Sequence, residues 1–220
     1  MTSEIALVAD TGGSWYFRHV DLLSTVLLAL AAVATAWATY QGAHWRSEQG
    51  LAGNRSTAAR VQANRAAGVA NRQIQNDALV FTQWVDAYSN GDTKLAAFYF
   101  RRFRPEFRPA VSAWTATKPL KNPKAPLTPF EMPEYRSAAL ATADGLEAKG
   151  GIESAVAQGH VDRADRYTLC VVLFATSLFF AGISTRLGTK RSRGAVLAMG
   201  WVMFIGALAW MATFPANFAL

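Results

Sequence analysis

The sequence predicts an all-α integral membrane protein with three transmembrane helices, an extracytoplasmic helical hairpin and a small aromatic-rich helical tip. Three segments, Leu22 to Ala43, Tyr167 to Thr185 and Ala195 to Ala216, contain no Asp, Glu, Lys or Arg. Each is close to the ~20 residues that a helix needs to cross a bilayer. Residues 21 to 104 contain no proline, which favours one long helix that continues beyond the first span.

The first apolar segment also has an interpretation as a signal peptide, because Ala-x-Ala patterns occur around residues 34 to 38. Its apolar region is longer than the usual ~7 to 15 residues of such peptides. The segment before it contains three acids, Glu4, Asp10 and Asp21, and one basic residue, Arg18. The N-terminal segment of a signal peptide is instead positively charged. We therefore expect a retained transmembrane helix.

The expected topology follows from the basic loop between the second and third spans, residues 186 to 194. This loop contains Arg186, Lys190, Arg191 and Arg193. Short loops as basic as this one stay in the cytoplasm. The N-terminal segment, residues 1 to 20, is then cytoplasmic as well, and residues 44 to 165 are extracytoplasmic. The formal net charge of +7 gives no reason to expect a nucleic-acid partner.

Turn and proline signals divide the chain further. The expected elements are the first span (21–43), a long helix (44–89), short helices (93–117), a Pro-rich connector (118–133), a return helix (134–165), the second span (166–185), the third span (195–216) and a tail (217–220). The long helix should end at the turn of residues 89 to 92, and Asp92 should cap the next helix. The connector holds five of the eight prolines and should be extended. Pro133 should begin the return helix, and Gly150 and Gly151 should kink or break it.

Apolar residues in the long helix are spaced as in a coiled coil. They are Ala63, Ala67, Ala70, Ile74, Ala78, Phe81, Val85 and Tyr88. The alanine half buries little apolar surface, so we expect a homo-oligomer in which these helices pack together. The aromatic half predicts a small core at the tip, which is completed by Trp84, Leu95, Phe98, Phe103, Phe107 and Trp114.

Charge predicts that the outgoing and returning helices pair as an antiparallel hairpin. Residues 41 to 76 carry five arginines against Glu48, whereas residues 134 to 165 carry six acids against three basic residues. Each exposed pair contributes well under ~1 kcal/mol. The charges therefore determine which two helices pair, but they add little to the stability of the hairpin.

Few residues are candidates for chemistry. His44 and His160 follow the first span and precede the second, and they form a candidate metal pair with Glu48 and Asp162 near them. Interfacial histidines among lipid headgroups are the commoner explanation, which we favour. The chain contains no G-x-S-x-G, Walker A or H-E-x-x-H pattern, so we expect neither enzyme activity nor a cofactor.

The segment RRFRPEFRP, residues 101 to 109, interleaves arginine with phenylalanine. It is either a site for acidic polymers or lipid headgroups, or a helix junction whose aromatic residues enter the core and whose arginines pair with Glu106, Glu131 and Glu134. We favour the junction. The candidate partner surface at the tip consists of Trp84, Tyr88, Arg101, Arg102, Arg104, Phe107, Arg108 and Trp114. A collar at the outer membrane interface is expected from Trp37, Tyr40, Gln41 and Trp45.

Three stretches resemble an uncharacterised family of small bacterial membrane proteins. They are TAWATYQGAHWRSEQ (35–49), FTQWVDAYSNGDTKLAAFYFRRFRPEFRPAVSAW (81–114) and NPKAPLTPFEMPEY (122–135). The family has TAW-x-x-YQ-x-x-x-W, F-x-QW-x-x-AY, F-R-P-E-F-R-P and T-P-F-x-M-P-E-Y motifs. The resemblance covers nearly the whole chain and implies three spans in a bacterial cytoplasmic (inner) membrane. It implies no activity, because none is assigned to the family.

Two classes of function follow. The first is a non-catalytic envelope scaffold or interaction module, whose partners are membrane lipids, further copies of itself and another envelope protein. The alternative is a homo-oligomeric channel with a pore along the first span, lined by Ser24, Thr25, Thr35, Thr39 and Ser177. Together with Ala32, Ala36, Ala38 and Gly42, these small residues also suit helix packing, which we favour. Carboxylates and lysines are absent from the three apolar segments, which disfavours a transporter or pump.

Overall fold

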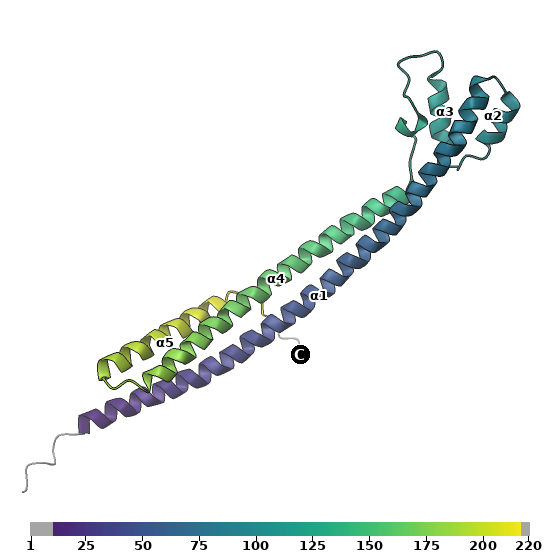
Figure 1. Ribbon diagram of the computed structural model, residues 1–220. Helices are drawn as coiled ribbons and strands as arrows, with labels where there is room; N and C mark the ends of the chain where they lie inside the picture. Colours follow the sequence, from purple (N-terminus) through teal and green to yellow (C-terminus); the bar gives the residue numbers. More distant parts are fainter. Residues whose placement is uncertain (1–10, 217–220) are drawn as a thin grey trace, which may run out of the picture. The chain divides into compact units, whose positions relative to one another are not determined.

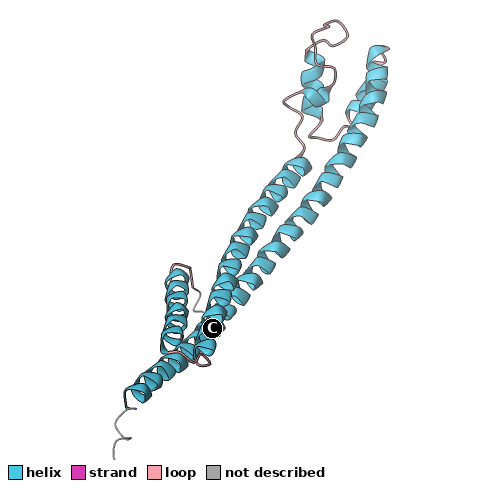
Figure 2. Ribbon diagram, turned by 60° about the vertical axis from the view of Figure 1, so that its left-hand side comes forward, coloured by secondary structure: helices cyan, strands magenta, loops and turns pink. Residues whose placement is uncertain are grey.

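The computed structural model describes residues 11–216, with side chains from residue 18 onward. These residues form helices and their connections, and no strand occurs within that range (Figures 1 and 2). The elements are α1 (Thr11–Ser89), α2 (Thr93–Phe100), α3 (Arg108–Ala116), the 3₁₀ turn η1 (Pro129–Glu131), α4 (Ala138–Ser184) and α5 (Lys190–Met211). Helices α1, α4 and α5 are long and apolar enough to cross a membrane. The all-α class and the three candidate spans are therefore confirmed, while residues 1–10 and the tail 217–220 lie outside the described residues.

The chain divides into two compact units. Within the described residues, unit 1 comprises residues 11–53 and 155–216, and unit 2 comprises Asn54–Ser154. In unit 1, α1, α4 and α5 lie side by side (Figure 1) around one apolar core. The buried positions of α1 recur at intervals of four and three residues: Val20, Ser24, Leu27, Ala31, Ala34, Ala38, Gln41 and Trp45. The spacing predicted for the outer part of α1 holds only in part. Ala63, Ala70 and Phe81 are buried, Tyr88 is exposed, and the other predicted positions are half-buried.

A polar cluster joins the three helices of unit 1 beside the α4–α5 connection. The guanidinium group of Arg193 forms an ion pair with Asp21 of α1 and donates a hydrogen bond to the Ser184 carbonyl oxygen at 3.1 Å. The Ser24 and Ser184 hydroxyl groups lie 3.0 Å apart. Arg193 was predicted to belong to the basic loop of residues 186–194, but it is buried in α5, where Asp21 neutralises its charge. Arg186, Lys190 and Arg191 are exposed, but the loop is shorter than predicted, since α5 begins at Lys190.

In unit 2, the helices α1 and α4 contact each other closely. The Ser56 hydroxyl group donates a hydrogen bond to the Gly150 carbonyl oxygen at 2.8 Å. Arg60 and Glu147 form an exposed ion pair at 3.9 Å, as the opposite charges of the two segments predict. Helix α4 starts at Ala138 rather than at Pro133, because the Ser137 hydroxyl group accepts a hydrogen bond from the Leu140 amide. It also continues through Gly150 and Gly151, so of the kink or break predicted there, the break is wrong.

Gly150 is required by this close approach. A Cβ atom at Gly150 would lie 2.9 Å from Arg60 Cγ and 3.4 Å from the Ser56 carbonyl oxygen, whereas a Cβ atom at Gly151 would meet nothing within 4 Å. We therefore expect Gly150→Val to destabilise unit 2 by about 1–3 kcal/mol through overpacking. Gly151→Ala should instead stabilise α4 by up to ~1 kcal/mol through helix propensity. Thermal unfolding of the two full-length variants, followed by circular dichroism, measures both effects, and a Gly150→Val melting curve identical to that of the wild type would contradict the close approach.

The tip of unit 2 begins at the predicted turn. Gly91 adopts a φ angle of 75° there, which glycine tolerates best, and the Asp92 carboxylate accepts a hydrogen bond from the Leu95 amide at 2.9 Å. The predicted cap is therefore confirmed. Both following helices are shorter than expected, since α2 ends at Phe100 and α3 begins at Arg108.

The core of the tip differs from the predicted one in its membership. Phe81, Trp84, Phe103, Phe107 and Trp114 are buried as expected. Tyr88, Leu95 and Phe98 were also placed in this core but are exposed, because α2 turns Ala96 inward instead. Residues of the predicted connector and just after it complete the core: Pro129, Phe130, Met132 and Tyr135. The connector is thus partly a structural element rather than only an extended link.

Candidate functional site

In the tip, the motif RRFRPEFRP joins α2 to α3 through aromatic contacts and ion pairs. Phe103 and Phe107 face inward, with ring centroids 5.1 Å apart. Phe107 also stacks on Phe130 at 4.9 Å and meets the edge of Tyr135 at 5.5 Å. Aromatic pairs at these separations add to the burial of the rings, so the phenylalanines of the motif fix the join between the two helices.

The arginines of the motif serve the same structural purpose. Arg104 Nε donates to both carboxylate oxygens of Asp77 at 3.1 Å, and Arg104 Nη2 donates to Asp77 Oδ2 at 2.7 Å. Arg104 Nη1 reaches Glu106 Oε2 at 2.5 Å. Asp77 is only 3% exposed, so water does not solvate its carboxylate. The guanidinium group of Arg104 compensates the charge instead. The predicted Arg104–Glu106 pairing is confirmed, whereas the Asp77 partner was missed because it is distant in the sequence.

This ion pair shifts the titration of its neighbourhood. Hydrogen bonding and attraction to Asp77, followed by the weaker effect of Glu106, raise the pKa of Arg104. Burial raises the pKa of Tyr135, and the negative charge of Asp77 raises it further. Arg104 therefore stays charged and Tyr135 stays neutral near neutral pH, which suits a structural cluster rather than an acid–base site.

Two further arginines are bound locally. Arg108 Nη2 donates to the Arg101 carbonyl oxygen at 2.7 Å, and Arg108 Nε donates to the Phe103 carbonyl oxygen at 3.0 Å. Both acceptors lie in the turn that follows α2, whose carbonyl groups lack helical partners. The Arg102 guanidinium group lies 3.5 Å from the centroid of the exposed Phe98 ring, in a cation–π contact.

Most residues of the predicted partner surface are therefore buried or half-buried. Trp84, Phe107 and Trp114 are buried, because they form the aromatic core that holds the helices together. Arg104 and Arg108 are half-buried and bind within the tip. Only Tyr88, Arg101 and Arg102 of the predicted set are exposed.

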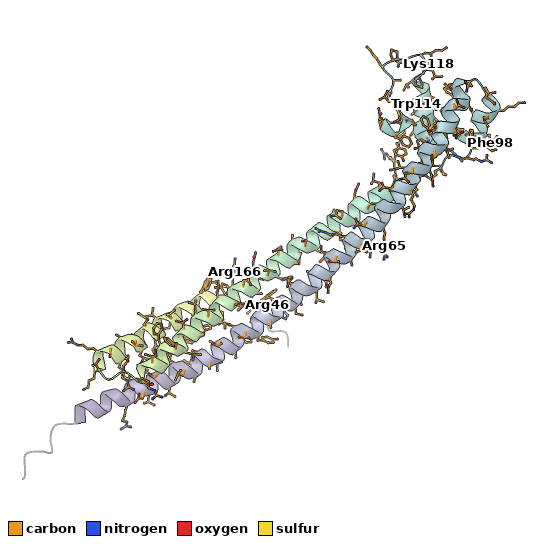
Figure 3. The ribbon with its side chains drawn as sticks, viewed as in Figure 1. Arg46, Arg65, Phe98, Trp114, Lys118 and Arg166 are labelled. Carbon is orange, nitrogen blue, oxygen red and sulfur yellow. The ribbon has the colours of Figure 1, made fainter. Side chains whose placement is uncertain are left out.

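The loop that follows α3 exposes residues that the sequence did not single out. Leu127 is 84% exposed and Leu120 is 59% exposed. Lys118 precedes Leu120, and Lys121 and Lys124 lie between the two leucines; all three lysines are exposed, and Figure 3 labels Lys118. Two hollows open on this loop, one of about 400 Å³ floored by Phe81 and Trp114, the other of about 300 Å³ lined by Tyr88, Lys118, Leu120 and Lys121.

The candidate metal pair of unit 1 surrounds a tryptophan. The His160 ring stacks on Trp45 at 5.4 Å, and the His44 ring meets Trp45 edge-on at 5.5 Å. Arg163 covers the same indole at 4.6 Å. Within residues 11–216, no group of three or more His, Cys, Asp or Glu side chains is arranged to hold a metal ion. The ring contacts place both histidines in an aromatic cluster around Trp45.

The predicted collar divides in the same way. Tyr40 is exposed and Trp37 is half-buried, so both remain candidates for anchoring at a membrane interface. Gln41 and Trp45 are buried between the helices of unit 1, because they occupy the inward positions of the four-and-three spacing.

Comparisons with known protein families, with curated proteins and with solved structures give no match for this chain.

Proposed function

We propose that the chain is a non-catalytic, homo-oligomeric protein of a bacterial cytoplasmic membrane that acts as an envelope scaffold or interaction module. In this proposal, α1, α4 and α5 span the membrane. The basic α4–α5 connection is cytoplasmic according to the positive-inside rule, and unit 2 is extracytoplasmic. The tip supports an interaction role, because the phenylalanines of its motif form an aromatic core and the motif presents no reactive group.

One observation carries the oligomeric part of the proposal. A face of α1 opposite its buried positions consists of small residues that are exposed in the single chain: Thr25, Ala29, Ala32, Ala36, Thr39 and Ala43. They recur at intervals of four and three residues, as the buried positions do. Small residues let helix backbones approach closely in a membrane. A hollow of about 420 Å³ between this face and α4, lined in part by Thr39, Ala43, Thr168 and Val171, offers further room for a second copy.

Hydrogen bonding favours packing over a pore lining for the polar residues of the spans. The Ser177 hydroxyl group donates to the Gly200 carbonyl oxygen of α5 at 2.8 Å, and Ser24 is buried in the polar cluster of unit 1. The hydroxyl groups of Thr25, Thr35 and Thr39 each donate to the carbonyl oxygen four residues earlier in α1. These groups therefore have partners within one chain.

A steric substitution on the small face tests the oligomer. We expect Ala36→Phe to shift the protein towards the monomer at micromolar concentration, because a large ring prevents close helix approach. Val33→Phe is the matched control, since Val33 is 70% exposed on the same helical turn but lies on the large-residue face. Equilibrium sedimentation in detergent measures the mass. A monomeric wild-type protein, or equal dissociation of both variants, would refute the proposal.

A further inference from the structure

We propose that the loop formed by residues 117–127, here called the tip loop, docks on an anionic phospholipid surface. Its lysines would contact phosphate groups while Leu120 and Leu127 enter the apolar layer. This inference names the partner of the interaction module proposed above and rests on that function. It assigns to the tip a lipid partner other than the bilayer that α1, α4 and α5 would span.

Charge at the tip supports an anionic partner. Residues 91–135, which include the short helices and the loop of the tip, contain eight Lys or Arg residues and four acids, Asp92, Glu106, Glu131 and Glu134. Glu106 is bound to Arg104, which also neutralises the buried Asp77. Among the described residues, Lys94, Lys118, Lys121 and Lys124 have no ion-pair partner within 4 Å. The cations of the tip therefore exceed the acids that the protein supplies, and clusters of this kind attract anionic lipids.

Apolar exposure distinguishes a lipid surface from a purely ionic partner. Leu120 lines both hollows of the tip loop, beside Lys118 and Lys121 in one and beside Leu127 in the other. Leu120 is thus shared by the hollow that contains Leu127 and the hollow that contains the two lysines. Apolar side chains that enter the headgroup and acyl boundary, together with lysines that contact anionic headgroups, are the pattern of interfacial membrane binding.

The tip loop is held in this conformation before any partner arrives. Trp114 Nε1 donates to the Pro126 carbonyl oxygen at 2.8 Å, and Asn122 Nδ2 donates to the Thr117 carbonyl oxygen at 3.2 Å. The amides of Lys121 and Asn122 donate to the Lys118 carbonyl oxygen at 2.8 and 2.9 Å. Because the loop is already ordered, docking loses little conformational entropy.

Lys118 provides a separate indication of function. Its φ angle is 55°, in the left-handed region that glycine and asparagine tolerate better than lysine. An unfavourable backbone conformation at a residue that also lines a hollow indicates a requirement for that side chain. A lysine at residue 118 places an ammonium group beside Leu120.

Co-flotation tests the inference on the full-length protein. The protein is placed in nanodiscs of zwitterionic lipid, so that its own bilayer offers no net charge, and is mixed with vesicles that contain about a third of phosphatidylglycerol. We expect the wild type to float with these vesicles and not with vesicles of phosphatidylcholine alone. Lys118→Asn with Lys121→Gln should weaken binding about 25-fold, at roughly fivefold for each charge removed. Leu120→Ser with Leu127→Ser should weaken it at least tenfold.

Matched controls lie outside the tip loop. Lys149→Gln removes an exposed charge from α4, and Leu79→Ser removes an exposed leucine from α1, and both should bind vesicles as the wild type does. All the variants change exposed side chains, and near-ultraviolet circular dichroism confirms that the aromatic core of the tip is intact. Absence of flotation for the wild type, equal flotation with neutral vesicles, or losses as large in the controls would each overturn the inference. Sedimentation of the same samples reports the oligomer separately, so failure of docking and failure of the proposed scaffold are distinguishable.

Discussion

Replacing Phe107 by alanine should unfold much of the tip. The Phe107 side chain is fully buried and contacts the rings of Phe81, Phe103, Phe130 and Tyr135. Removing such a ring from a core costs about 3–5 kcal/mol, which is a large fraction of the ~5–15 kcal/mol that stabilises a typical domain. Urea unfolding of the full-length protein in detergent, followed by near-ultraviolet circular dichroism of the aromatic core, measures the loss.

Phe98→Ala is the control for this experiment. Phe98 is 40% exposed, and its ring contacts the Arg102 guanidinium group and the Tyr99 ring. An exposed cation–π contact contributes about 0.5–1 kcal/mol, so the loss should stay within that range. A loss for Phe98→Ala as large as that for Phe107→Ala would restore the core predicted from the sequence and contradict the structure.

The contrast between these two phenylalanines shows that the sequence does not predict which side chains near α2 are buried. Residues 95 to 100 read LAAFYF, an uninterrupted apolar run on a helix of eight residues, so periodicity cannot select its inward face. The choice depends on α3 and η1, which approach from elsewhere in the chain. Features that depend on local chemistry were predictable: the Asp92 cap, the Gly91 turn and the three apolar helices.

The candidate site shows the same limit. Arg104 was assigned to local acids, and Glu106 is indeed a partner, but its main partner Asp77 lies 27 residues earlier. The spacing predicted for α1 passes from Ile74 to Ala78 and leaves out Asp77, whereas the structure buries Asp77. A buried acid needs a cation, so the error in the predicted spacing also hid the ion pair. Arg193 was likewise assigned to a basic loop, since its pairing with Asp21 depends on how α1 and α5 pack.

Removing the Arg104 side chain charge should destabilise unit 2 more than removing its partner. Arg104→Met leaves the Asp77 carboxylate buried without its counter-charge, for which we expect a loss of about 3 kcal/mol. Asp77→Leu should cost only about 1 kcal/mol, because Arg104 is part-exposed and keeps Glu106 as a partner. The asymmetry follows from burial, since the uncompensated charge is costly only where water is excluded.

The double variant decides whether the two residues act as a pair. Asp77→Leu with Arg104→Met replaces both charges by apolar groups, and such replacements are often close to neutral. We expect the double variant to be about 2 kcal/mol more stable than Arg104→Met alone, which corresponds to strong coupling between residues in contact. Urea unfolding of the four proteins completes the cycle. If the loss of stability in the double variant equals the sum of the two single losses, the two residues are not coupled. The buried carboxylate would then have another partner, and the Asp77–Arg104 pair would not stabilise the tip.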